Sequence, residues 1–291
     1  MQFLTYLFLY PIIWLISVLP FPIFYKFSDF ICFIVYRLIR YRKKVVRNNI
    51  ELTLPHLTKN ERLIIEKKFY SHMCDMFLEM IKTFSISQKE IEKRFTFSNI
   101  DVYYDLEKKN KSIALLCAHY ASYEWVISMN YHINYKGFGI YKKLANPYFD
   151  KLVKRIRSKF KAELITTKET ISTIAENQKN KVLGLYGFAS DQSPRASSAY
   201  HYTSFMGQVV PVHTGAEMLA KRFDMNIIFL KVKKVKRGHY EASFELLTDD
   251  ATSVPNYEIT DRFLSLVEQQ IYEAPEYYLW THKRWKNIIE R

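Results

Sequence analysis

The first forty residues are apolar without a clear period. Residues 1–25 carry no charged side chain, and a second apolar stretch covers residues 27–39. Pro11, Pro20 and Pro22 break helices, so no clean apolar run reaches the roughly 20 residues that span a bilayer. No basic n-region or cleavage site marks a removable signal peptide. We therefore expect a retained N-terminal apolar helical segment that anchors the protein to a membrane.

A basic cluster follows this apolar segment. Apolar helices that end in such a cluster are typical of a membrane whose cytoplasmic face is anionic. This pattern divides the chain into a membrane anchor with a basic flank, residues 1–47, and a globular domain, residues 48–291. A buried hairpin within the core is the alternative for the apolar segment. The cluster consists of Arg37, Arg40, Arg42, Lys43, Lys44 and Arg47.

Beyond Pro55 the pattern becomes that of an α/β domain. Thr58 and Glu61 have the spacing of a capping box and predict a helix to about residue 82. Ser87 and Glu90 repeat this signal for a short helix. Short apolar runs then alternate with helical patterns, which predicts a largely parallel, mixed sheet flanked by helices. The strands are expected at 113–118, 138–141, 182–188 and 227–232, with an antiparallel edge strand at 240–247, and the helices at 123–132, 147–160 and 214–223.

Composition narrows the possible partners and the compartment. The formal charge of +14 attracts polyanions, which include nucleic acid, anionic lipid and an acidic carrier protein. Cys32, Cys74 and Cys117 lie far apart and form no CxxC pair, which favours a reducing, cytosol-facing location. The histidines and cysteines show no metal-ligand spacing, so no metal and no cofactor are predicted.

His119 is the first candidate for chemistry. It directly follows the predicted strand 113–118, and Glu124 comes five residues later. In open α/β sheets, ligands bind at the carboxyl ends of strands. A neutral imidazole there can take the proton of an attacking hydroxyl, while a carboxylate behind it fixes its tautomer. We predict that His119 is a general base oriented by Glu124, although a structural histidine is the alternative that this short pattern alone favours.

Two further polar clusters complete the set of candidates. Residues 190–195 follow the predicted strand 182–188 and include Asp191, whose alternative role is that of a turn or helix-cap residue. The stretch 142–161 is strongly basic and fits phosphates or an acidic protein helix, with a solvated helix face as the alternative. From these clusters we expect substrate binding by Lys142, Lys151, Lys154, Gln192 and Arg195.

These residues, in this order, resemble the late acyltransferases of lipid A biosynthesis, the lauroyl and myristoyl transferase family. The similarity covers nearly the whole chain, and the order and spacing of its pieces are specific. The matching pieces are the apolar N-terminus, 47–50, Leu54, Pro55, Glu79, 119–124, Asn146, Pro147, Arg157, Asp191, Gln192, 205–207, 215–220, Pro275, 278–280 and 283–286.

The resemblance implies a glycerolipid-acyltransferase-like fold and a catalytic dyad of His119 and Glu124, with Arg157 and Asp191 in the same site. It implies an acyl carrier protein thioester as donor and an anionic inner-membrane glycolipid as acceptor, with the enzyme at the cytoplasmic face. Residues 48–291 are then the acyltransferase domain. The sequence Ala-Ser-Tyr at 121–123 departs from the family's usual small-Asn-Trp, which puts the acceptor in question more than the reaction.

The transfer forms an oxyanion that needs hydrogen-bond donors, either backbone N–H groups or Arg157. Two alternatives to the predicted function remain. Transfer to another membrane lipid, such as a phosphatidylinositol glycolipid or an amino-acid lipid, fits the same residues. A membrane-tethered nucleic-acid binder would explain the charge and the basic run 231–237, but that run alternates like a protected edge strand and no nucleic-acid-binding signature accompanies it. We therefore predict no nucleic-acid partner.

Overall fold

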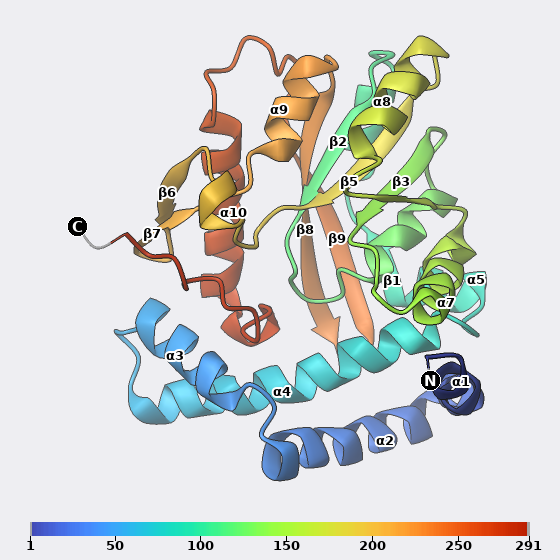
Figure 1. Cartoon of the computed structure of the whole chain (residues 1–291), viewed down its shortest axis with the longest axis vertical. Helices are drawn as coiled ribbons and strands as arrows, with labels where there is room; N and C mark the ends of the chain where they lie inside the picture. The colour runs from blue at the N-terminus through green and yellow to red at the C-terminus, as the bar shows by residue number, and fades with distance from the viewer. Residues whose placement is uncertain (1, 290–291) are drawn as a thin grey trace.

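A computed structural model of the chain describes residues 2–289 and, for Ala196, the backbone alone (Figure 1). Seven strands form one sheet in the order β1-β9-β8-β2-β5-β3-β4. All neighbouring pairs run parallel except β8 and β9, which are antiparallel. Helices flank the sheet, so the predicted α/β fold with a largely parallel, mixed sheet is confirmed.

The strands are short apart from the β8–β9 hairpin. All five residues of β2 are buried, as the continuous apolar run from residue 113 predicted. A separate antiparallel hairpin is formed by β6 and β7. The strands are β1 (Phe95–Phe97), β2 (Ile113–Cys117), β3 (Lys136–Tyr141), β4 (Glu163–Thr166), β5 (Gly184–Ala189), β6 (Tyr202–Phe205), β7 (Gln208–Pro211), β8 (Asn226–Lys236) and β9 (His239–Thr248).

The predicted capping box opens the longest helix. The Thr58 N–H donates to the Glu61 carboxylate at 2.7 Å, and the Glu61 N–H donates to the Thr58 hydroxyl at 3.3 Å. The second signal is also confirmed, because the Glu90 N–H donates to the Ser87 hydroxyl. The α-helices are α1 (Gln2–Val18), α2 (Phe21–Phe33), α3 (Lys43–Thr53), α4 (Lys59–Lys82), α5 (Gln88–Arg94), α6 (Asp101–Glu107), α7 (Pro147–Arg157), α8 (Thr170–Lys179), α9 (Gly215–Arg222) and α10 (Glu258–Glu273).

Shorter helical turns connect these elements. The expected helix 123–132 is a 3₁₀-helix, η2 (Trp125–Tyr131). The other turns are a π-helical turn η1 (Ile34–Ile39) and the 3₁₀ turns η3 (Ser158–Phe160), η4 (Ala196–Ser198) and η5 (Pro275–Tyr277).

Two strand expectations need correction. Residues 240–247 lie in β9, which pairs antiparallel with β8 as expected, but β1 covers its other side. The basic run 231–237 begins in β8, which lies between β2 and β9 and is not an edge strand. Neither β1 nor β4 was predicted from the sequence, because three or four residues are too few to establish alternation.

The expected apolar membrane-anchoring segment at the N-terminus is wrong. No helix within residues 2–289 combines the length and the apolar character needed to cross a membrane. The chain turns at Pro20, so α1 has 17 residues and α2 starts as a new helix. Lys26 and Asp29 lie within α2, and its buried residues Phe24 and Ser28 face inward. In Figure 1, α2 lies along the side of α4 that is turned away from the sheet, whereas α1 and α3 lie near opposite ends of α4.

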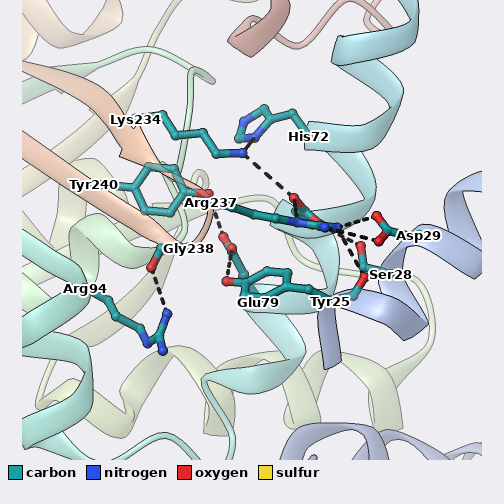
Figure 2. Close-up of polar contacts among 11 residues, drawn as sticks. Tyr25, Ser28, Asp29, His72, Glu79, Arg94, Lys234, Arg237, Gly238 and Tyr240 are labelled. Carbon is teal, nitrogen blue, oxygen red and sulfur yellow. Dashed lines mark hydrogen bonds and ion pairs between the residues drawn. The ribbon is translucent and has the colours of Figure 1, made fainter. Parts of the chain in front are cut away.

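A polar network ties α2 and α4 to the β8–β9 hairpin (Figure 2). Arg237 donates to Asp75 of α4 at 2.7 and 2.9 Å and to Asp29 of α2 at 2.6 Å. Lys234 Nζ lies 3.8 Å from the Asp75 carboxylate and 3.2 Å from Nδ1 of His72. The basic run at the end of β8 therefore faces carboxylates and does not serve as a protected sheet edge.

Candidate active site

His119 and Asp191 meet at the carboxyl edge of the sheet. They follow β2 and β5, which are parallel neighbours, and the register pairs Cys117 with Ala189 two residues before each of them. Nδ1 of His119 lies 2.7 Å from Oδ1 of Asp191, and the backbone N–H of His119 donates to the same oxygen at 3.0 Å. Asp191 is buried, whereas the His119 side chain keeps 20% of its surface exposed. The imidazole can therefore face a substrate while its carboxylate partner stays away from water.

The pKa values of the two groups reflect this pairing. Burial lowers the pKa of His119, but the charge and hydrogen bond of Asp191, and then the charge of Glu124, outweigh it, so the pKa is raised. Burial raises the pKa of Asp191, but His119 outweighs that effect and the pKa is lowered. An ionised Asp191 next to Nδ1 favours the tautomer with the proton on Nδ1. Nε2 of His119 is then left with a lone pair that can accept a proton.

Glu124 pairs with Arg157. Arg157 is the last residue of α7, and its Nε and Nη2 donate to the two oxygens of Glu124 at 2.9 and 2.6 Å. Burial lowers the pKa of Arg157, but the Glu124 carboxylate outweighs it and the pKa is raised. The hydrogen-bonding partner of Glu124 is therefore Arg157, whereas the sequence predicted that Glu124 orients His119. All four predicted catalytic residues gather at one place, but Asp191 is the carboxylate that orients the imidazole.

The loop between His119 and Glu124 is held from two sides. From the C-terminal segment, the carbonyl of Tyr277 accepts the N–H of Ala121 at 3.0 Å. From α4, the Trp125 indole N–H reaches the Glu79 carbonyl at 3.2 Å and the Thr83 hydroxyl at 3.0 Å. Ala121 has a φ of 47°, a left-handed conformation that is strained for a residue with a Cβ. These contacts stabilise a loop that the local sequence alone does not favour.

His282 and Arg284 are site residues to which the sequence assigned no role. Nε2 of His282 accepts the N–H of Ser193 at 3.3 Å, and burial lowers the His282 pKa to about 4, so its imidazole is neutral near pH 7. The buried Arg284 donates to the Ser193 hydroxyl and to the Pro211 carbonyl, both at 3.0 Å. Both residues support the loop that carries Asp191. A signal for Arg284 was present, because the resemblance includes residues 283–286, whereas His282 lies outside the matching pieces.

The predicted substrate-binding residues are more dispersed. Lys142 and Arg195 are exposed, and Gln192 is half-buried beside Asp191. Lys151 is exposed on α7, and Lys154 lies over the ring of Tyr141 at 5.5 Å. Their role in substrate binding stays a prediction. Within residues 2–289, no three His, Cys, Asp or Glu side chains are arranged to hold a metal ion.

Comparison with known proteins gives consistent matches over the length of the chain. A family model described as bacterial lipid A biosynthesis acyltransferase matches residues 1–287. A lipid A biosynthesis lauroyltransferase of Escherichia coli is 23% identical over 96% of this chain and 90% of its own length. A lipid A biosynthesis acyltransferase of Haemophilus influenzae is 22% identical over 84% of this chain and 78% of its own. A lipid A biosynthesis palmitoleoyltransferase of E. coli is 20% identical over 94% of this chain and 89% of its own.

Proposed function

The chain belongs to the bacterial lipid A biosynthesis acyltransferase family, and from this membership we propose that it transfers a fatty acyl group from an acyl carrier protein thioester to a hydroxyl of a lipid A precursor or a related glycolipid. The observation that supports this reaction best is the contact of 2.7 Å between His119 and Asp191 at the partly exposed carboxyl edge of the sheet. A histidine with a buried carboxylate behind it is suited to activating an alcohol.

The reaction starts with the free Nε2 of His119. This nitrogen takes the proton of the acceptor hydroxyl as the hydroxyl oxygen bonds to the thioester carbonyl carbon. The resulting tetrahedral oxyanion collapses, the carbon–sulfur bond breaks, and the leaving thiolate takes the proton from the imidazolium. The products are a lipid ester and the free thiol of the donor. Asp191 stabilises the imidazolium throughout, because its carboxylate accepts the Nδ1 proton.

Glu124 and Arg157 have a supporting role in this proposal. The charge of Glu124 raises the His119 pKa and so helps to stabilise the imidazolium. Because two nitrogens of Arg157 already donate to Glu124, backbone groups are the better candidates for the oxyanion. Within residues 2–289, the N–H groups of Ser122 and Tyr123 donate to no protein acceptor, and both lie in the loop that follows His119. Preorganised donors of this kind are typically worth roughly 3 kcal/mol each.

We place the reaction at the cytoplasmic face of the inner membrane. The acceptor proposed here is a lipid, so the enzyme must reach a lipid surface. The donor is a cytosolic carrier protein, and the three free cysteines fit a reducing compartment.

The reaction can be tested with purified protein, acyl carrier protein thioester and a lipid A precursor, with mass spectrometry of the lipid product. We expect a mass increase of one acyl chain, and His119→Ala should reduce the rate by 10²–10⁴-fold, the range typical of general bases. Wild-type protein that forms no acylated product under these conditions would contradict the proposed reaction. Retention of more than about a tenth of the rate by His119→Ala would exclude His119 as the base.

In the same assay, Asp191→Asn distinguishes the role of the Asp191 carboxylate from that of the Glu124 carboxylate. His119 must be neutral to act, so wild-type activity should rise with pH through a pKa above the ordinary value for histidine. Without the Asp191 charge the burial of His119 lowers that pKa, so the acidic limb should move to lower pH while the maximal rate falls. An unchanged acidic limb would show that Asp191 does not set the protonation of the base.

A further inference from the structure

An open pocket lies at the N-terminal part of α3, and the residues that line it are not among those assigned to catalysis. Its volume is about 520 Å³. Four of the five residues that line it are cationic, and the fifth is an amide. The lining residues are Arg40, Lys43, Lys44, Arg47 and Asn48.

The charge of this pocket is poorly compensated from within the protein. Glu66 is the carboxylate that faces it, and its two oxygens accept from Arg47 at 2.7 and 3.2 Å. Lys43 is 3.9 Å from Glu66 and lies over the ring of Tyr36 at 3.7 Å. Within residues 2–289, Arg40 and Lys44 form no ion pair. An anion in the pocket would supply the charge that the protein does not.

The backbone adds to this positive potential. Lys43 and Lys44 are the first two residues of α3, where the helix dipole places positive partial charge, and no acidic residue lies in the first turn. The positive end of the dipole repels these lysines, whereas it stabilises an anion. Burial lowers the pKa of Lys43, and the charges of Arg47 and Arg40 lower it further against the opposing effect of Glu66. The free pocket therefore carries an electrostatic cost that binding an anion relieves.

The number and type of cations favour phosphate. Arginine offers a planar fork that matches phosphate oxygens, and lysine acts as a flexible point charge. Four cations exceed what one carboxylate needs and suit the higher charge of a phosphate monoester. Leu38 and Ile39, directly before Arg40, are 66% and 63% exposed. Apolar side chains next to a cationic pocket favour a phosphate carried by a lipid over one free in solution.

We propose that the pocket lined by Arg40, Lys43, Lys44, Arg47 and Asn48 is a binding site for a phosphate ester group. The shared chemistry is a phosphate monoester, carried by a lipid headgroup or by a small soluble molecule. Binding at this site does not depend on acyl transfer, so it can be measured whether or not the reaction proposed above occurs.

The test compares two double variants of the full chain that remove the same charge. Arg40→Asn with Lys44→Ala changes the pocket, and asparagine suits the left-handed backbone at residue 40, where φ is 53°. Lys181→Asn with Lys179→Ala is the matched control, because Lys181 is also exposed and left-handed, with a φ of 56°. In Figure 1 the control residues adjoin α8, at the opposite end of the molecule from α3.

Binding is measured by co-sedimentation with phosphatidylcholine vesicles that contain phosphatidic acid, with and without added glycerol phosphate. We expect the pocket variant to bind about 30-fold more weakly than wild type, and the control less than about threefold, because each cation at an anionic lipid surface contributes about 1 kcal/mol. A lipid source is supported if glycerol phosphate does not compete at millimolar concentration, and a soluble phosphate is supported if it does. Equal loss in both variants, or no binding of either probe by wild type, would overturn the proposal.

Discussion

Glu79 shows what burial does to a single residue. Its carboxylate, on α4, accepts hydrogen bonds from the hydroxyls of Tyr25 and Tyr240, each at 2.8 Å, as Figure 2 shows. Burial, and then the charge of Asp75, raises the pKa of Glu79 from 4.5 to about 7. The backbone carbonyl of the same residue holds Trp125, the neighbour of Glu124. Glu79 therefore lies in the part of the fold that supports the loop between His119 and Glu124.

We expect Glu79→Gln to remove a pH dependence of stability. Between pH 4.5 and about 7 the folded protein holds a proton on Glu79 that the unfolded chain lacks, so the free energy of unfolding falls as pH rises through this window. The variant stays neutral at all pH values. Between pH 5 and pH 8 the free energy of unfolding of the variant should therefore rise by about 3 kcal/mol relative to that of wild type, as the size of the pKa shift implies. Urea denaturation of both proteins at the two pH values measures this gain, and parallel pH profiles would contradict it.

At the scale of elements, the β8–β9 hairpin is attached to the helical layer through ionic contacts. Arg237, directly after β8, pairs with Asp75 of α4 and Asp29 of α2. The Asp75 side chain is 2% exposed, whereas Arg237 keeps 37% exposed. Removal of the arginine would leave a buried carboxylate with less compensation, and such losses are more destabilising than the pair itself is stabilising.

Arg237→Met should therefore destabilise the protein by about 2 kcal/mol. This is below the range of about 3 to 5 kcal/mol for breaking a fully buried pair, because Arg237 is partly solvated and Lys234 still faces Asp75. The matched control is Arg262→Met, whose pair with Glu245 is 50% and 45% exposed and should contribute less than about 1 kcal/mol. Midpoints of urea unfolding measure both effects. Equal shifts in the two variants would mean that the hairpin does not depend on this buried contact.

At the scale of the whole molecule, the surplus of positive charge would affect the encounter with the proposed carrier-protein donor. The formal charge is +14, and acyl carrier proteins are strongly acidic. Opposite potentials raise the rate of encounter more than they strengthen the bound state. Lys151 and Lys154 lie on α7, the helix that ends at Arg157, so a carrier bound there would be close to the site.

Reversal of Lys151 and Lys154 to Glu should raise the apparent KM for the carrier-bound donor several-fold and leave kcat nearly unchanged. Salt should have the same effect on wild type, because the Debye length falls from about 10 Å at 0.1 M to about 3 Å at 1 M. A small thioester without carrier is the substrate control, and reversal of the exposed Lys59 and Lys67 on α4 is the charge control. Equal losses with both donors would show that the basic stretch serves the acceptor or a lipid surface.

The sequence by itself determined the elements whose signals are local. The capping boxes at Thr58 and Ser87 depend on groups three residues apart, so they could be predicted without the fold. The buried strands at the centre of the sheet were visible as apolar runs, and the polar residues after β2 and β5 were visible as candidates for chemistry. The family was also visible, because its pieces recur in order along most of the chain.

Tertiary structure decided which of these groups touch. Glu124 is five residues from His119 and Asp191 is 72 residues away, yet the parallel register of β2 and β5 brings Asp191 to the imidazole. Tertiary structure also decided how the N-terminal segment is arranged. Its apolar composition predicted a membrane anchor, but the segment forms separate helices that pack on α4. Pairing across a sheet and packing between helices depend on contacts distant in sequence, and no local pattern specifies those contacts.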